Sequence, residues 1–111
     1  MNNYIQIYKN ALDDSYCDEL IKKFENNQDQ IEVHDQNPMS FSQINLNENL
    51  WKDDVDKLVK VFQKHIIQYK KNCDITNQMW PNDFVYEHIR MKRYLPNDKD
   101  QFLPHTDAND Y

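Results

Sequence analysis

The stretch that decides the fold is Tyr86-Glu-His-Ile-Arg-Met-Lys-Arg-Tyr94, which a short loop joins to Gln101-Phe-Leu-Pro-His105-Thr-Asp107. It predicts two strands, because Pro96-Asn97-Asp98 between them has turn chemistry and Pro104 favours an extended residue before it. On an extended backbone, residues two apart point to the same face, separated by about 6.6 Å. His105 and Asp107 therefore end the second strand as a pair that can contact one metal ion.

An imidazole and a carboxylate on one face supply two ligands of the 2-His-1-carboxylate triad, which holds Fe(II) and leaves further positions open. Such a short motif occurs by chance in a chain rich in Asp, so its setting carries the prediction. On these grounds we predict His105 and Asp107 as metal ligands.

With its setting, the stretch resembles the iron(II)/2-oxoglutarate-dependent dioxygenases, in particular the prolyl 4-hydroxylase-like branch. The matched features are a strand ending in Arg93-Tyr94, the turn Pro96-Asn97, the aromatic Phe102 and the motif His105-Thr-Asp107. The front of the chain, with Ile5–Tyr8 and the run Leu12–Ile21, is similar to the family's opening strand and first helix.

The resemblance implies an α+β fold: the N-terminal half of a double-stranded β-helix, of the jelly-roll or cupin-like kind, with two supporting helices. It also implies Fe(II) on His105 and Asp107, 2-oxoglutarate as cosubstrate in contact with Tyr94, and ascorbate as a further small molecule. The expected reaction is hydroxylation of a peptidyl-proline or another C–H substrate, either a peptide or a small molecule.

Two positions depart from the family pattern. Asn97 stands where the family usually has Gly, an exchange that Asn allows because it visits left-handed backbone readily. Phe102 stands where many members have Tyr. The family's second iron-binding His and its 2-oxoglutarate-binding basic residue come several strands after His-x-Asp, whereas this sequence stops at Tyr111. We therefore expect residues 1–111 to be a single truncated domain, inactive alone, and the reading frame to continue.

The remaining elements follow from periodicity. Tyr4–Tyr8 alternates as a strand does, and Asp13 suits the N-cap of a helix. The apolar face of that helix comprises Cys17, Leu20, Ile21 and Phe24. Strands are expected at 30–34 and 39–46, with Ser42, Ile44 and Leu46 on one face, and a helix at 49–71 carries an apolar stripe from Trp51 to Tyr69. Residues 76–83 have the composition of a loop.

The strand from Tyr86 has a polar face and a mixed face. The polar face comprises Tyr86, His88, Arg90, Lys92 and Tyr94. It either lines the cavity of the β-helix or is the charged edge of a sheet, protected against unwanted pairing. His88 is an alternative metal ligand, whereas His65, beside a helical stripe, is expected at the surface.

Composition excludes several classes. The 111 residues include 19 acidic and 13 basic ones, for a net charge of -6 and without a basic cluster, which disfavours nucleic-acid binding. No apolar run is long enough for a membrane span, and Cys17 and Cys73 lack Cys-x-x-Cys spacing, so a cytoplasmic location is expected. The competing function is a non-catalytic, acidic α+β interaction module, in which His-Thr-Asp is a coincidence.

Overall fold

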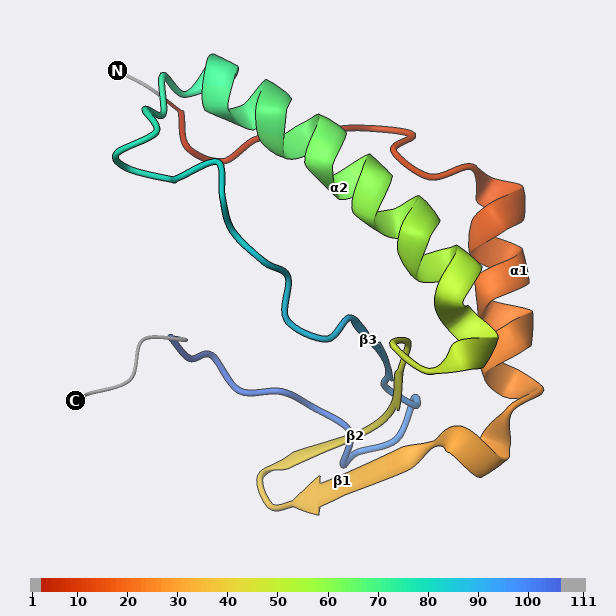
Figure 1. Cartoon of the computed structure of the whole chain (residues 1–111). Coiled ribbons are helices and arrows are strands. Elements are labelled where there is room, and N and C mark those ends of the chain that lie inside the picture. The colour runs from red at the N-terminus through yellow and green to blue at the C-terminus, as the bar shows by residue number, and fades with distance from the viewer. Residues whose placement is uncertain (1–2, 107–111) are drawn as a thin grey trace.

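The structure, a computed structural model, describes residues 3–106 as an α+β arrangement of two helices and one sheet (Figure 1). The elements are α1 (Asp14–Glu25), β1 (Glu32–Gln36), β2 (Met39–Asn45), α2 (Lys52–Asn72) and β3 (Arg90–Arg93). Short 3₁₀ turns, η1 (Gln28–Gln30) and η2 (Asn49–Trp51), lead into β1 and α2.

The three strands form one open antiparallel sheet in the order β1-β2-β3. In its register, His34 lies opposite Phe41 and Ile44 opposite Met91. β2 is therefore the central strand, and it is buried along nearly its whole length. Beyond β3, a single bridge joins Ser40 to Gln101, whose backbone groups exchange two hydrogen bonds of 2.9 and 3.1 Å.

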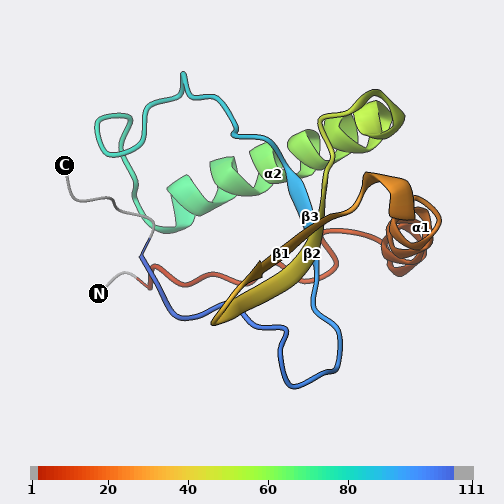
Figure 2. The same ribbon diagram turned by 90° about the horizontal axis from the view of Figure 1, so that it is seen from below.

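The core lies between the sheet and the two helices, which are on the same side of it (Figures 1 and 2). Its buried members are Tyr16, Leu20, Phe24, Ile44, Leu46, Trp51 and Leu58. Trp51 is completely buried, and its indole N–H donates a 2.8 Å hydrogen bond to the side chain of Gln30. That bond satisfies a polar group that burial would otherwise penalise.

Both predicted helices are confirmed. The buried face of α1 is rotated by one residue at its start, so that Tyr16, Leu20 and Phe24 pack inward while Ile21 is 52% exposed. The buried residues recur every four positions, whereas the predicted face also included residues three positions apart. The buried stripe therefore runs at a different angle to the helix axis from the predicted one. The 3₁₀ turn η2 precedes α2, and the first half of α2 supplies its core residue: Leu58 is buried, whereas Phe62 is 39% exposed.

The strand predictions are confirmed in part. β2 matches residues 39–46 closely, and Ile44 and Leu46 face the helices as expected. β1 begins two residues later than predicted because Gln28–Gln30 is a 3₁₀ turn. Its charged and polar side chains are all exposed.

Three strand predictions are wrong in extent. Residues 4–8 form no strand, because their backbone contacts α2 instead: the Tyr69 hydroxyl donates to the Tyr4 carbonyl at 2.9 Å. The strand expected at 86–94 is reduced to Arg90–Arg93, since the amide of Ile89 donates to the side chain of Asn47. The strand expected from Gln101 is a single bridge, and Asp107 lies outside the described residues.

The chain is more open than a compact domain of its length. Its radius of gyration is 16.6 Å, whereas about 13 Å is typical of a compact domain of this size. One face of the sheet is not covered by a helix (Figure 2). Within residues 3–106, neither helix combines the length and the apolar character that a bilayer crossing needs.

Candidate functional site

The sheet has a helix-free face, formed by the side chains that point away from the core. Because side chains alternate along a strand, Phe41 and Gln43 of β2 point to this face when Ile44 packs against the helices. Their neighbours in register are His34 on β1 and Lys92 on β3. The face is therefore polar and aromatic, as the sequence predicted for Lys92 and Tyr94.

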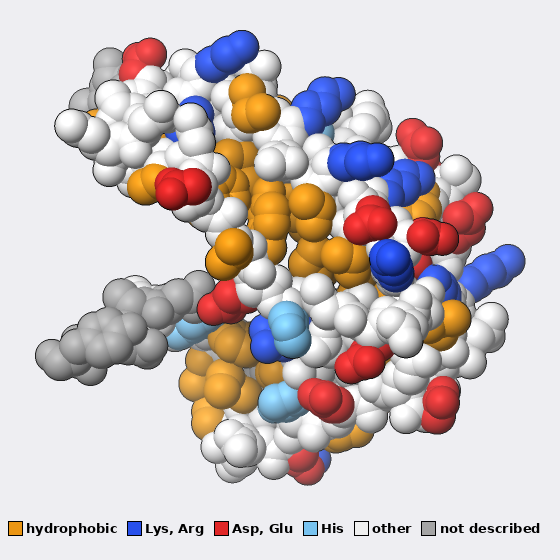
Figure 3. Space-filling model, in the orientation of Figure 1, with side chains coloured by type: hydrophobic (Ala, Val, Ile, Leu, Met, Phe, Trp, Pro, Cys, Tyr) orange, Lys and Arg blue, Asp and Glu red, His pale blue; other side chains and the backbone are white. Residues whose placement is uncertain are grey.

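Phe41 is the centre of a ring cluster on this face. Its ring stacks on His34 at 4.8 Å between centroids and packs tilted against Tyr94 at 5.6 Å and Phe102 at 5.7 Å. These separations are within the range at which aromatic pairs attract one another. Figure 3 shows hydrophobic and histidine side chains gathered at the sheet end of the molecule.

Lys92 joins the two chain segments of the cluster. Its ammonium lies 4.6 Å from the centroid of Phe41 and 4.6 Å from that of Phe102. A cation at this distance over a ring face is attracted by the ring quadrupole. The segment after Gln101 is thereby attached to the sheet by side chains, although it is not a strand.

The ring of His105 packs against the ring of Phe102, with 4.5 Å between their centroids. Its Nδ1 lies 2.9 Å from the carbonyl oxygen of Leu103. A carbonyl can only accept, so Nδ1 carries the proton, and in the neutral imidazole Nε2 then has the lone pair. A backbone carbonyl that fixes the tautomer in this way is typical of metal-binding histidines.

The structure thus brings three residues of the predicted motif, Tyr94, Phe102 and His105, into one ring cluster around Phe41. The position of Asp107 relative to His105 lies outside the described residues. Within residues 3–106, no three His, Cys, Asp or Glu side chains gather in a metal-binding arrangement.

Asp100 is a residue of this region that the sequence argument did not single out. Its carboxylate accepts a 2.8 Å hydrogen bond from the Leu95 amide and a 3.0 Å bond from the Ser40 hydroxyl. The hydrogen bond from the Leu95 amide is the main reason why the pKa of Asp100 is lowered. Asp100 therefore closes the turn and connects it to β2. The feature of the sequence that could have indicated this role is an Asp within a run of residues that favour turns.

Asn97 uses its side chain, not a left-handed backbone, to make the turn. Its Oδ1 accepts hydrogen bonds from the amides of Lys99 and Asp100 at 2.8 and 2.6 Å. Of the described residues, Asn10 and Asp74 are those with positive φ. The expectation that Asn97 replaces a left-handed Gly is therefore wrong.

The two other histidines considered in the sequence lie elsewhere. The amide of Asn45 is 3.0 Å from Nδ1 of His88. His65 donates from Nδ1 to the Val61 carbonyl on α2 and packs against the ring of Tyr8 at 4.9 Å.

We compared the chain with protein-family models, curated proteins and solved structures, and none of the three comparisons found a match. Function is therefore inferred from the residues themselves.

Proposed function

We propose that this chain is the N-terminal half of an iron(II)- and 2-oxoglutarate-dependent dioxygenase of the prolyl 4-hydroxylase-like kind. Its reaction would be hydroxylation of a peptidyl-proline or another C–H substrate. The observation that supports the proposal best is the ring cluster, in which Tyr94 and Phe102 pack against Phe41 on the helix-free face of the sheet and His105 packs against Phe102. All three residues belong to the sequence motif on which the resemblance to this family rests.

The shape of the sheet supports the proposal that the chain is half of a double-stranded β-helix. A double-stranded β-helix holds its site between two facing sheets, with helices outside. Here both helices cover one face of the sheet, and the opposite face has polar and aromatic side chains. A facing sheet contributed by later residues would enclose the helix-free face and reduce the openness of the chain.

The proposal places the metal at His105. Nδ1 of His105 donates to the carbonyl of Leu103, and in that tautomer the lone pair that would bind the metal is on Nε2. Asp107 would supply the carboxylate, and the third ligand would come from residues after Tyr111. When bound, Fe(II) would supply the site at which O2, with 2-oxoglutarate as co-reductant, is activated for hydroxylation.

Tyr94 is the residue proposed to hold 2-oxoglutarate. Its side chain is 43% exposed on the helix-free face, so the hydroxyl can donate to a carboxylate there. Phe41 supports one side of its ring. Lys92, on the same face, adds positive charge that favours a dicarboxylate.

Metal titration tests the proposal. Mn(II), a spectroscopic substitute for Fe(II), would be titrated into the chain and followed by electron paramagnetic resonance. We expect weak binding that His105→Ala and Asp107→Ala each abolish, while His65→Ala and His88→Ala leave it unchanged. Equal effects of all four substitutions, or binding that none of them alters, would contradict the proposed site.

A second candidate function, a non-catalytic interaction module, is favoured by the outer edge of β1. Within the described residues, β1 pairs only with β2, and all five of its side chains are exposed. An unpaired edge can accept an extended peptide as a further strand. The two candidates differ in whether the reading frame continues past Tyr111 with a His and a Lys or Arg; a frame that stops there favours the module.

A further inference from the structure

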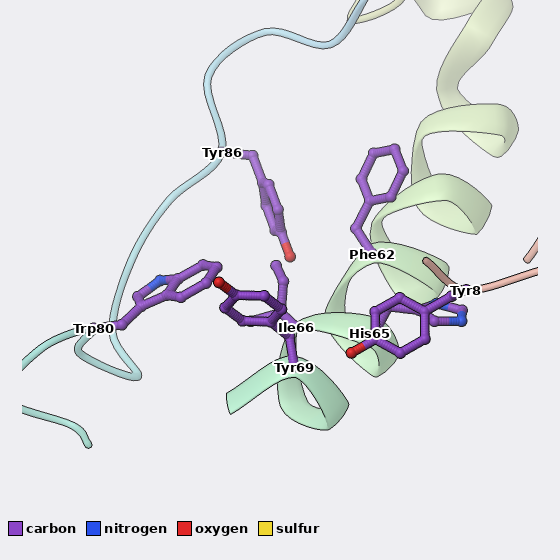
Figure 4. A pocket seen from close by; sticks show the side chains of 7 residues that line it. All are labelled: Tyr8, Phe62, His65, Ile66, Tyr69, Trp80 and Tyr86. Carbon is purple, nitrogen blue, oxygen red and sulfur yellow. The ribbon is translucent and has the colours of Figure 1, made fainter. Parts of the chain in front are cut away.

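A hollow of about 500 Å³ lies between α2 and the chain that follows it (Figure 4). We call it the aromatic groove; its lining residues are Tyr8, Phe62, His65, Ile66, Tyr69, Trp80 and Tyr86. Small-molecule sites commonly have volumes of about 300 to 1,000 Å³ and apolar, aromatic linings. Hydrophobic side chains are also visible in the hollow beside α2 in Figure 3.

The walls of the groove are held in place by hydrogen bonds. The ammonium of Lys70 donates to the Trp80 carbonyl at 2.8 Å and to the side chains of Asn77 and Asn82. The side chain of Asn72 donates to the Tyr8 hydroxyl at 3.2 Å. Both sides of the groove are therefore attached to α2 in the chain as it stands, and little ordering remains for a ligand to bring about.

Ring contacts continue the wall from the helix to the loop. Tyr69 packs edge-on against Trp80 at 6.4 Å, Trp80 against Phe84 at 5.7 Å, and Phe84 against Tyr86 at 5.4 Å. A planar ring inserted into such a surface can stack or pack edge-on with several of these side chains.

The charges around the groove favour a neutral ligand. None of the seven lining residues is an acid, a lysine or an arginine. Lys70, next to Tyr69 in sequence, already donates to three oxygens, which is the capacity of an ammonium group. A charged ligand would lose hydration here without gaining a carboxylate, ammonium or guanidinium partner from the lining.

One polar atom of the lining is shielded from solvent and lacks a hydrogen-bond partner within residues 3–106. The Tyr86 hydroxyl is shielded from solvent and makes no hydrogen bond within the described residues. Figure 4 shows its ring directing the hydroxyl toward α2, among the other lining side chains. Buried hydroxyls are nearly always paired, so an acceptor is missing at this point.

We propose that the aromatic groove binds a neutral, planar aromatic molecule that carries a carbonyl or ring-nitrogen acceptor for the Tyr86 hydroxyl. This binding site is separate from the ring cluster around Phe41 and does not depend on the dioxygenase proposal.

Three naphthalene probes test the proposal on the intact chain: 2-acetonaphthone, 2-ethylnaphthalene and 2-naphthoate. Binding is followed by NMR shifts of the Trp80 indole and the Tyr86 ring. We expect the ketone to bind about fivefold more tightly than the hydrocarbon, as one neutral hydrogen bond predicts, and the anion to bind more weakly than both. Tyr86→Phe should remove the preference for the ketone, while Tyr4→Phe, which deletes an exposed hydroxyl near the groove, should preserve it.

Phe62→Lys provides a second check, because Phe62 is partly exposed and a lysine there places a charge in the groove. It should abolish binding of the ketone. Four outcomes would overturn the proposal: no shift at Trp80 or Tyr86 with any probe, equal affinity of the wild-type chain for ketone and hydrocarbon, tightest binding of the anion, or the same shifts on raising protein concentration alone. The last would mean that a second copy of the chain occupies the groove.

Discussion

The ammonium of Lys23 on α1 lies 2.6 Å from Oδ2 of Asp54 on α2, and the Tyr16 hydroxyl donates to Oδ1 of the same carboxylate at 2.7 Å. Burial on its own would raise the pKa of Asp54, but the hydrogen bonds from Lys23 and Tyr16 outweigh it and lower the pKa below the ordinary 3.8. Burial, together with the bond to Asp54, raises the pKa of Tyr16. The carboxylate thus joins the two helices in its charged form.

This arrangement predicts how stability depends on pH. Because the pKa of Asp54 is lowered in the folded chain, its contribution is present above about pH 4 and is lost as the pH falls through the folded-state pKa. Asp54→Asn should lower stability by about 1 to 2 kcal/mol near pH 6 and by less near pH 3. The measurement is the urea midpoint of the helical circular dichroism signal at both pH values.

Asp53→Asn is the matched control for Asp54→Asn. Both acids are in the first turn of α2 and interact with the same helix dipole, so the control removes that common effect. A pH-independent loss, or the same loss from both substitutions, would contradict the proposed role of Asp54.

The helices and β2 could be predicted from sequence because each is long and periodic, and the core selects its apolar side chains. The Tyr16–Asp54–Lys23 contacts could not, since Tyr16 is 38 residues from Asp54 and Lys23 is 31 residues from it. No local sequence pattern indicates contacts between residues so far apart in the chain. These contacts result from the tertiary packing of α1 against α2.

The strands at 86–94 and after Gln101 were overpredicted for a related reason. Alternation indicates which side chains share a face, and Met91 and Lys92 do point to opposite faces. It does not indicate whether a neighbouring strand is available, and β3 ends where its pairing with β2 ends. In the candidate site, alternation along residues 86–94 predicted that Tyr94 and Lys92 share a face. It could not predict that Phe41 lies at the centre of that face, because this depends on the pairing of β2 with β3.

Lys92→Met should loosen the segment after Gln101, because it keeps the length of the side chain and removes the cation between Phe41 and Phe102. At about 0.5 to 1 kcal/mol per contact, we expect hydrogen exchange of the Gln101 amide, which donates to the Ser40 carbonyl, to accelerate several-fold. Arg90→Met deletes a cation two residues away on the same strand and should leave this rate unchanged. If both substitutions accelerate hydrogen exchange of the Gln101 amide equally, the effect is due to the change in net charge and not to the contacts of Lys92 with the two rings.

Tyr94→Phe tests the cosubstrate proposal in a protein expressed from a reading frame that continues past Tyr111. A hydrogen bond from a phenol to a carboxylate is worth about 1.5 to 3 kcal/mol, so the concentration of 2-oxoglutarate needed for half-maximal turnover should rise at least about tenfold. Tyr4→Phe is the control. An unchanged requirement in Tyr94→Phe would remove this residue from the binding set.

The isolated chain of 111 residues should be only marginally stable, and its surface explains why. Ile5, Ile7 and Val85 are 79%, 80% and 93% exposed, and the main core cluster has seven buried apolar side chains among the described residues, in a chain with a radius of gyration of 16.6 Å. Chains of this size bury a smaller share of their surface than larger domains do, and a sheet with no helix on one face, whose outer strands each pair with only one strand within residues 3–106, buries less still. We therefore expect helix and strand signals in far-UV circular dichroism, a broad thermal transition, binding of a hydrophobic dye and association at higher concentration.

Val85→Ser should reduce dye binding, since it removes the most exposed of these side chains, whereas Leu20→Ala in the core should lower the thermal midpoint and increase dye binding. A sharp two-state transition of a monomer that binds no dye would show that the chain is a complete small domain and would contradict the half-fold proposal.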